Sequence, residues 1–129
     1  MTLAYIALGG AVGAVARYGI SGWVYDRLGD AFPWGTLAVN ILGCLALGVV
    51  MRWLQVSAAH PALRPSLTIG LLGAFTTFST FSYEAVALLQ DGQWARAGLY
   101  VGGSVLVGLI AVVAGMAVVT GLARAGGAA

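Results

Sequence analysis

The chain has 129 residues, of which 60% are hydrophobic and only 8% are charged, and its mean hydropathy is +0.96. About a quarter of the residues in ordinary soluble domains are charged, so this composition excludes a soluble globular protein and indicates an integral membrane protein. The net charge of +2 comes from six arginines without any lysine, which is too diffuse for a nucleic-acid-binding surface.

Four apolar segments follow one another along the chain, separated by short polar connections. They cover residues 3–25, 34–54, 66–90 and 94–123, and each is long enough for a membrane span, which needs about 20 residues. We find no internal repeat and no soluble domain. The sequence therefore predicts an all-α integral membrane protein in which residues 1–129 form one domain with four transmembrane helices.

The third segment has an unusual centre between Gly70 and Phe81. Two glycines, four hydroxyl residues and three phenylalanines occupy these twelve positions. Glycine and hydroxyl side chains weaken a helix, so we expect this helix to break at about residues 73–76. Broken helices inside membranes commonly build ion sites. A close helix crossing through small residues would explain the glycines about as well, but it explains less well why Phe78 and Phe81 share one face.

Three polar side chains lie within or near the spans, and two of them have competing interpretations. Asn40 either bonds to a neighbouring helix or offers its amide N–H groups to an anion. Arg17 either extends to the headgroups or attracts anions to a vestibule. Glu84, the only glutamate, comes late in the third segment, and we expect it at the membrane interface.

On the fourth segment, Tyr100 and Ser104 lie four residues apart and form a hydroxyl-bearing stripe.

The arginines are distributed almost evenly between the two ends that four spans would create. One end has Arg52, Arg64 and Arg124, and the other has Arg27 and Arg96, with Arg17 nearby. Because the Lys/Arg bias of short loops sets orientation, such a chain can insert both ways. Four short helices are also few to enclose a pore. An antiparallel homodimer with the broken helices at its axis satisfies both observations, and a cation there would have carbonyl ligands.

Three of the segments contain distinctive runs of residues. They are the glycine-rich run from Gly9 to Tyr18, the run from Trp34 to Gly43, and the Thr-Thr-Phe-Ser-Thr-Phe sequence within residues 70–81. Together these runs resemble the Fluc/CrcB fluoride channels. The third run is specific, whereas the glycine pattern alone is weak, and the fourth segment matches by its length and its Tyr/Ser stripe.

This resemblance implies a dual-topology antiparallel homodimer in the bacterial inner membrane, with two pores for passive fluoride efflux. It also implies a structural Na⁺ at the dimer axis, bound by the backbone carbonyls of Gly73 and Thr76. The residues that it assigns to the fluoride path are Arg17, Asn40, Thr77, Phe78, Phe81, Tyr100 and Ser104. Amides, hydroxyls and phenyl edges are uncharged donors, which can replace the water around fluoride yet release the ion.

The chain departs from the family pattern at three positions. Leu72 and Ala74 replace the cysteine and glycine that often flank the break, and Gly108 stands where a serine often continues the polar track. Carbonyl ligands tolerate the first two changes, but the third leaves the far end of the track undefined.

Three other functions compete with a channel. A small dual-topology multidrug exporter would have the same architecture, but proton-coupled exporters of this kind need a carboxylate within the membrane. A membrane subunit without transport activity would use Asn40 and the break for packing alone. An enzyme is the weakest alternative, since the sequence lacks paired acid and base groups, a nucleophile motif and a metal cluster.

Overall fold

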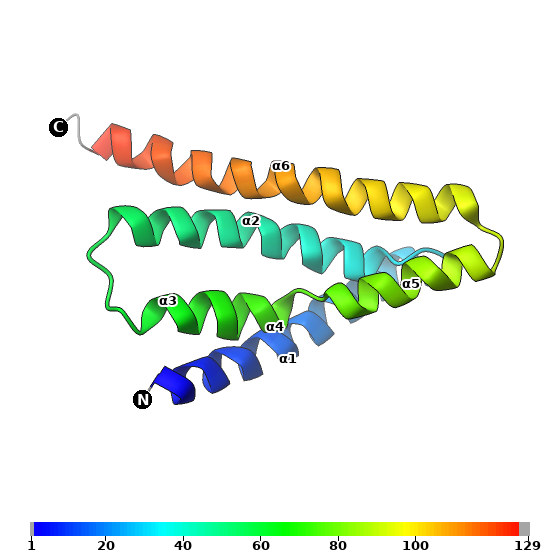
Figure 1. The fold of residues 1–129 in the computed structure, drawn as a ribbon, viewed down its shortest axis with the longest axis horizontal. Helices are drawn as coiled ribbons and strands as arrows, with labels where there is room; N and C mark the ends of the chain where they lie inside the picture. The colour runs from blue at the N-terminus through cyan, green and yellow to red at the C-terminus, as the bar shows by residue number, and fades with distance from the viewer. Residues whose placement is uncertain (1, 127–129) are drawn as a thin grey trace.

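The computed structural model describes residues 2–126, in which the regular secondary structure is helical and no strand occurs. Its elements are α1 (Thr2–Leu28), α2 (Trp34–Val56), α3 (Leu63–Pro65), the π-helix η1 (Ser66–Leu72), α4 (Gly73–Phe75), α5 (Phe78–Gln90) and α6 (Trp94–Gly126). The chain runs along the molecule four times, because α3, η1, α4 and α5 lie end to end as one interrupted rod (Figure 1). Both ends of the described chain consequently lie at the same end of the molecule.

Three helices are long and apolar enough to cross a membrane, namely α1, α2 and α6. They occupy the segments expected over residues 3–25, 34–54 and 94–123. The 33 residues of α6 correspond to about 50 Å, which exceeds a hydrocarbon core of about 30 Å. The expected span over 66–90 is divided in the structure, so neither half is a candidate by itself.

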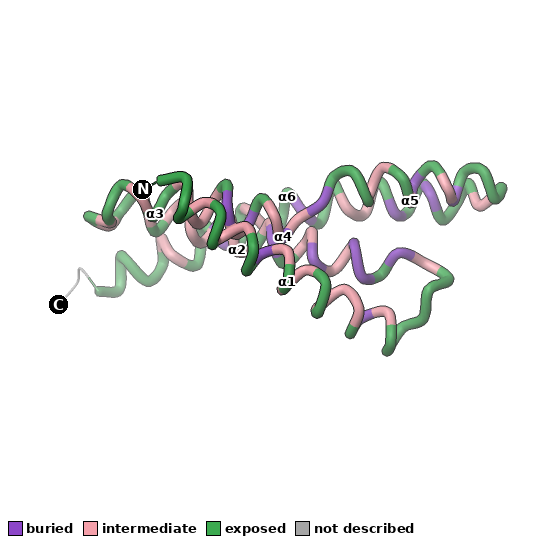
Figure 2. Tube along the Cα trace, turned by 90° about the horizontal axis from the view of Figure 1, so that it is seen from below, coloured by how far each residue is buried: buried purple, intermediate pink, exposed green. Residues whose placement is uncertain are grey.

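Glycines bring the helix backbones into direct contact at two crossings. A Cβ on Gly13 of α1 would overlap the carbonyl of Leu71 in η1, and a Cβ on Gly48 of α2 would overlap the carbonyl of Val112 in α6. Lipid provides little hydrophobic drive for helices to associate, so close backbone approach through small residues is a main source of packing. Figure 2 shows that buried residues lie where the helices cross, whereas the outer surfaces are exposed.

The interruption in the third segment lies at Thr76 and Thr77, which have extended backbones. The sequence predicted it at residues 73–76, with unwinding near Gly73. Gly73 instead has helical angles (φ −65°, ψ −34°) and follows the π-helix directly. A π-helix is rare and distorts the ordinary hydrogen-bond register. The glycine is therefore not the point at which the helix opens.

Candidate functional site

A cavity of about 320 Å³ lies beside the break. Its wall contains five of the residues assigned to the fluoride path, together with both residues assigned to Na⁺: Asn40, Thr77, Phe78, Phe81, Ser104, Gly73 and Thr76. They come from α2, both halves of the interrupted rod, and α6. The structure thus brings one amide, several hydroxyls and two phenyl rings to a single cavity.

Asn40 bonds to the backbone of Thr77 through both ends of its amide. Its Oδ1 accepts from the Thr77 N–H at 2.8 Å, and its Nδ2 donates to the Thr77 carbonyl at 3.1 Å. Both interpretations of Asn40 are therefore compatible with the geometry, because the amide NH₂ has a second N–H. Gly43, one turn further along α2, leaves space for the Thr76 methyl group, since a Cβ there would overlap it.

The second half of the rod begins with a side-chain cap. Thr77 is buried, and its Oγ1 accepts from the N–H of Thr80 at 3.2 Å and lies 2.9 Å from the Thr80 hydroxyl. A threonine at this position satisfies one of the free N–H groups at a helix start. The cap defines where α5 begins, so Phe78 and Phe81 have fixed positions on its first turn. Their ring centroids are 5.8 Å apart.

The carbonyls of Gly73 and Thr76 have lost their usual partners for an identifiable reason. In a continuous helix Gly73 would accept from the Thr77 N–H, and Thr76 would accept from the Thr80 N–H. The first N–H is bonded to Asn40 and the second to the Thr77 hydroxyl. Gly73 is also exposed. These two carbonyl oxygens are neutral ligands that suit a hard cation such as Na⁺. Residues 2–126 offer no group of three His, Cys, Asp or Glu side chains as an alternative metal site.

Glu84 accepts hydrogen bonds from three hydroxyl groups, a cluster that the sequence did not predict. Its Oε1 accepts from Tyr25 at 3.1 Å and from Thr36 at 2.9 Å, while its Oε2 accepts from Tyr100 at 2.7 Å. These partners belong to α1, α2 and α6, so the carboxylate connects four elements. The expectation of a simple interfacial glutamate missed this cluster. The only available signal was a single glutamate within an apolar segment.

Tyr100 lies behind the cavity wall and does not line it. The residue is fully buried, its ring centroid is 5.1 Å from that of Phe81, and its hydroxyl is bonded to Glu84. Its hydroxyl is therefore committed to a carboxylate in this structure. The Phe81 ring packs against the buried cluster that contains Tyr100.

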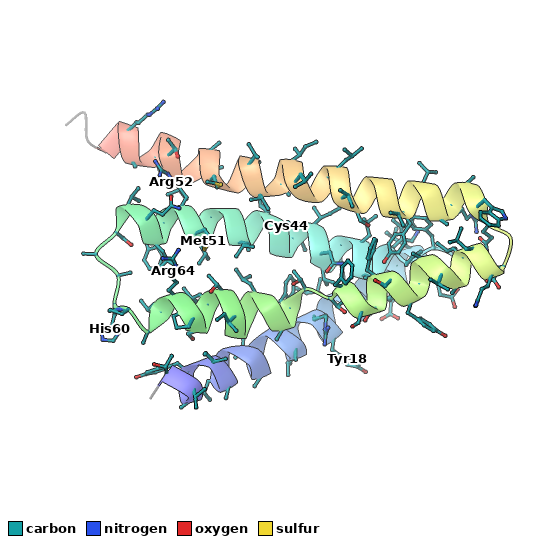
Figure 3. The ribbon with its side chains drawn as sticks, in the orientation of Figure 1. Tyr18, Cys44, Met51, Arg52, His60 and Arg64 are labelled. Atoms are coloured by element: carbon teal, nitrogen blue, oxygen red, sulfur yellow. The ribbon has the colours of Figure 1, made fainter. Side chains whose placement is uncertain are left out.

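Arg17 belongs to a second cavity of about 250 Å³. This cavity is lined by side chains from α1, α2 and α5, including Arg17, Tyr25, Thr36, Thr77, Thr80 and Glu84. Thr77, the residue that caps the start of α5, lines both cavities. Tyr18, next to Arg17, points away from the helices (Figure 3) and is 83% exposed.

The hydroxyl stripe of α6 continues differently from the family pattern. Ser104 lines the first cavity, and its Oγ is buried without a hydrogen-bond partner among the described residues. Gly108 does not line the cavity; a Cβ there would contact the thiol of Cys44 on α2 at 3.4 Å. Cys44 itself lines the cavity, so a thiol adjoins the position where a serine hydroxyl was expected.

The long apolar helices, together with a cavity at a helix break that contains a few polar groups, define a multi-pass helical membrane protein. Residues 4–116 match the model of the family described as "CrcB-like protein, Camphor Resistance (CrcB)". The chain belongs to the CrcB family.

Similar proteins include several called "Fluoride-specific ion channel FluC". The relative from Geotalea daltonii is 51% identical over 110 residues, which cover 84% of this chain and 89% of the relative. The relative from Acidobacterium capsulatum is 47% identical over 113 residues, covering 87% and 90% respectively. The relative from Magnetococcus marinus is 50% identical over 116 residues, covering 89% and 94%.

Proposed function

We propose that this protein is a fluoride channel that lets fluoride leave the cytoplasm passively and so limits its toxicity. The observation that carries the proposal is the cavity in which Asn40, Phe78, Phe81 and Ser104 meet. The relatives named as fluoride-specific channels support it, since they match most of the chain.

The chemistry of this cavity suits a small, strongly hydrated anion. The second amide N–H of Asn40, the unpaired Ser104 hydroxyl and the positive edges of the Phe78 and Phe81 rings are all uncharged donors. Conduction needs sites that are favourable enough to enter yet weak enough to leave. Several modest donors meet this requirement better than one fixed charge, which would bind fluoride too firmly.

The active form in this proposal is an antiparallel homodimer. Gly73, Phe78, Ser79 and Thr80 are exposed around the break, and Phe78 is 80% exposed. Irregular backbone does not face lipid directly, because lipid cannot satisfy its polar groups. A second copy would cover this surface, and the two chains would bring together the carbonyls of Gly73 and Thr76 around a structural Na⁺. When bound, Na⁺ would make the dimer axis electropositive without being transported.

The proposal also assigns four membrane crossings to each chain. The interrupted rod from α3 to α5 would form the third crossing, since it runs between the same two ends as its neighbours (Figure 1). With the arginines nearly balanced between these ends, each chain would insert in either orientation in the bacterial inner membrane. The expected partners are a second copy, fluoride and lipid.

One observation favours a second candidate, the small multidrug-type exporter. Glu84 is partly buried among hydroxyl groups, and an embedded carboxylate is what a proton-coupled exporter requires. The two candidates differ in their driving force. An exporter would move its substrate only with a proton gradient, whereas a channel follows the gradient of the ion itself.

Fluoride efflux from proteoliposomes tests the proposal. Vesicles containing the purified protein are loaded with fluoride, and a potassium ionophore is added to start the efflux. The fluoride that appears outside is then measured with a fluoride-selective electrode. We expect rapid efflux with equal pH on both sides, and no comparable chloride efflux. Fluoride efflux that required a proton gradient, or that matched protein-free vesicles, would refute the channel.

A further inference from the structure

We propose that Asn40 is the positioning residue that opens the cation site at the break. This inference rests on the proposed function, because it takes the Gly73 carbonyl to be a Na⁺ ligand. It assigns to Asn40 a role distinct from donating a hydrogen bond to fluoride. The role is to keep one backbone N–H away from one backbone carbonyl.

The hydrogen-bond register of the interrupted rod changes at the break. The last ordinary helical bond before the break joins the Thr76 N–H to the Leu72 carbonyl at 3.0 Å. The next bond in that series would join the Thr77 N–H to the Gly73 carbonyl. It is replaced by the 2.8 Å bond from Thr77 to Asn40 Oδ1. Asn40 thus receives the donor that would otherwise occupy Gly73.

Asn40 stabilises the extended conformation of Thr77 as well. Its Nδ2 donates to the Thr77 carbonyl at 3.1 Å, so both backbone groups of Thr77 bond to one side chain. This pairing resembles the exchange of two bonds between neighbouring strands, and it favours the extended angles of Thr77 (φ −146°, ψ 114°). Without this pairing, two backbone groups inside the protein would lack partners, which favours closing the helical bond to Gly73.

Asn40 also connects the sites of the two ions in the proposed channel, fluoride and Na⁺. Asn40 lines the cavity together with Phe78 and Phe81, while its amide bonds to the residue next to Thr76. The same side chain therefore adjoins the fluoride path and determines the carbonyl geometry on the cation side. Residues that orient metal ligands without touching the metal typically change metal affinity by about 10–100-fold when they are replaced.

Three variants separate this role from general packing. Asn40→Asp retains an oxygen acceptor for the Thr77 N–H but removes the donor to the Thr77 carbonyl, so it separates the two bonds. Asn40→Leu retains similar volume but has no acceptor, and Asn40→Ser is too short to span to Thr77. Cys44→Ala is the matched control, because it changes the same helix and cavity wall one turn further on without altering a bond to the break.

The measurement is the thermal stability of each purified dimer in detergent as Na⁺ replaces N-methylglucamine, without fluoride. We expect Na⁺ to stabilise the parent protein and the Cys44→Ala variant fully, and to stabilise Asn40→Asp less well, because a carboxylate oxygen would face the Thr77 carbonyl in place of the amide donor. In Asn40→Leu and Asn40→Ser, the Na⁺ concentration for half of the effect should rise by about 10–100-fold. If Asn40→Leu does not fold, Asn40→Ser provides the same comparison.

Two outcomes would overturn the inference. One is unchanged Na⁺ dependence in Asn40→Leu or Asn40→Ser, which would show that Asn40 is not needed to free the carbonyl. The other is a parent protein without any Na⁺ dependence. Fluoride efflux from the same parent preparation shows whether this inference or the proposed channel function has failed. Efflux without Na⁺ stabilisation would refute this inference alone, whereas absent efflux would refute the channel.

Discussion

Phe78 and Phe81 are the side chains that best test how the cavity would stabilise an anion. Both line the cavity, and the Phe81 ring packs against the buried cluster that contains Tyr100. Replacing either phenylalanine with isoleucine retains an apolar side chain but removes the ring and its positive edge. We expect fluoride efflux to fall at least about tenfold, equivalent to about 1.4 kcal/mol, because edge interactions are of that order. The measurement is efflux from proteoliposomes with dimer content checked by size-exclusion chromatography. Normal efflux from both variants would mean that the rings only fill space.

Cys44 provides a direct probe of the same cavity, because it is the only cysteine in the chain. A small thiol reagent that reaches Cys44 would add bulk to the cavity wall that Ser104 also lines. We expect modification to reduce fluoride efflux severalfold in the parent protein and to leave Cys44→Ala unaffected. Labelling is followed by mass spectrometry. A fully labelled parent with undiminished efflux would show that this part of the cavity lies outside the path.

At the scale of elements, the break depends on space as well as on hydrogen bonds. Gly43 leaves room for the methyl group of Thr76, so a Cβ at this position would push against the extended segment. We expect Gly43→Val to destabilise the protein by about 1–3 kcal/mol through overpacking and to reduce efflux strongly. Gly121→Ala is the matched control, because a Cβ there meets no atom within 4 Å. Thermal unfolding measures the stability, and equal melting temperatures for Gly43→Val and the control would contradict the account.

The sequence contained the information for the helical segments but not for the hydrogen bonds at the break. Long apolar runs specify spans because they must match the membrane thickness. The glycines near residue 73 predicted an interruption, yet Gly73 is helical and the extended residues are Thr76 and Thr77. The interruption depends on Asn40, which is 37 positions away in sequence from Thr77. Local composition cannot reveal such a contact.

The same limit applies to Glu84, whose three partners lie on α1, α2 and α6. Its position late in a segment suggested an interfacial carboxylate, because depth along one helix is all that a sequence pattern gives. The packing of the other helices determines that hydroxyl groups surround it. The placement of Phe78, Phe81 and Ser104 on one cavity was more accessible, since spacing and a family resemblance both indicated it.

At the scale of the whole molecule, orientation follows from charge. Arg52 and Arg64 lie toward the end of the molecule where the described chain begins and ends (Figure 3), and the connections at the opposite end have a similar number of arginines. We expect C-terminal reporter fusions to be read on both sides of the membrane. Adding three lysines to the connection at residues 57–62 should bias insertion and lower activity, because it breaks the balance. A reporter found on one side only would exclude the dual-topology dimer.

Passive conduction of fluoride can be measured most directly as a reversal potential in a planar bilayer. The purified protein is fused into a bilayer with a tenfold fluoride gradient and with identical pH, Na⁺ and chloride on the two sides. For a passive fluoride channel we expect a current that reverses at the fluoride equilibrium potential, about 59 mV in magnitude for one charge. A reversal at zero voltage, or one that shifts when a pH or Na⁺ gradient is then imposed, would contradict it.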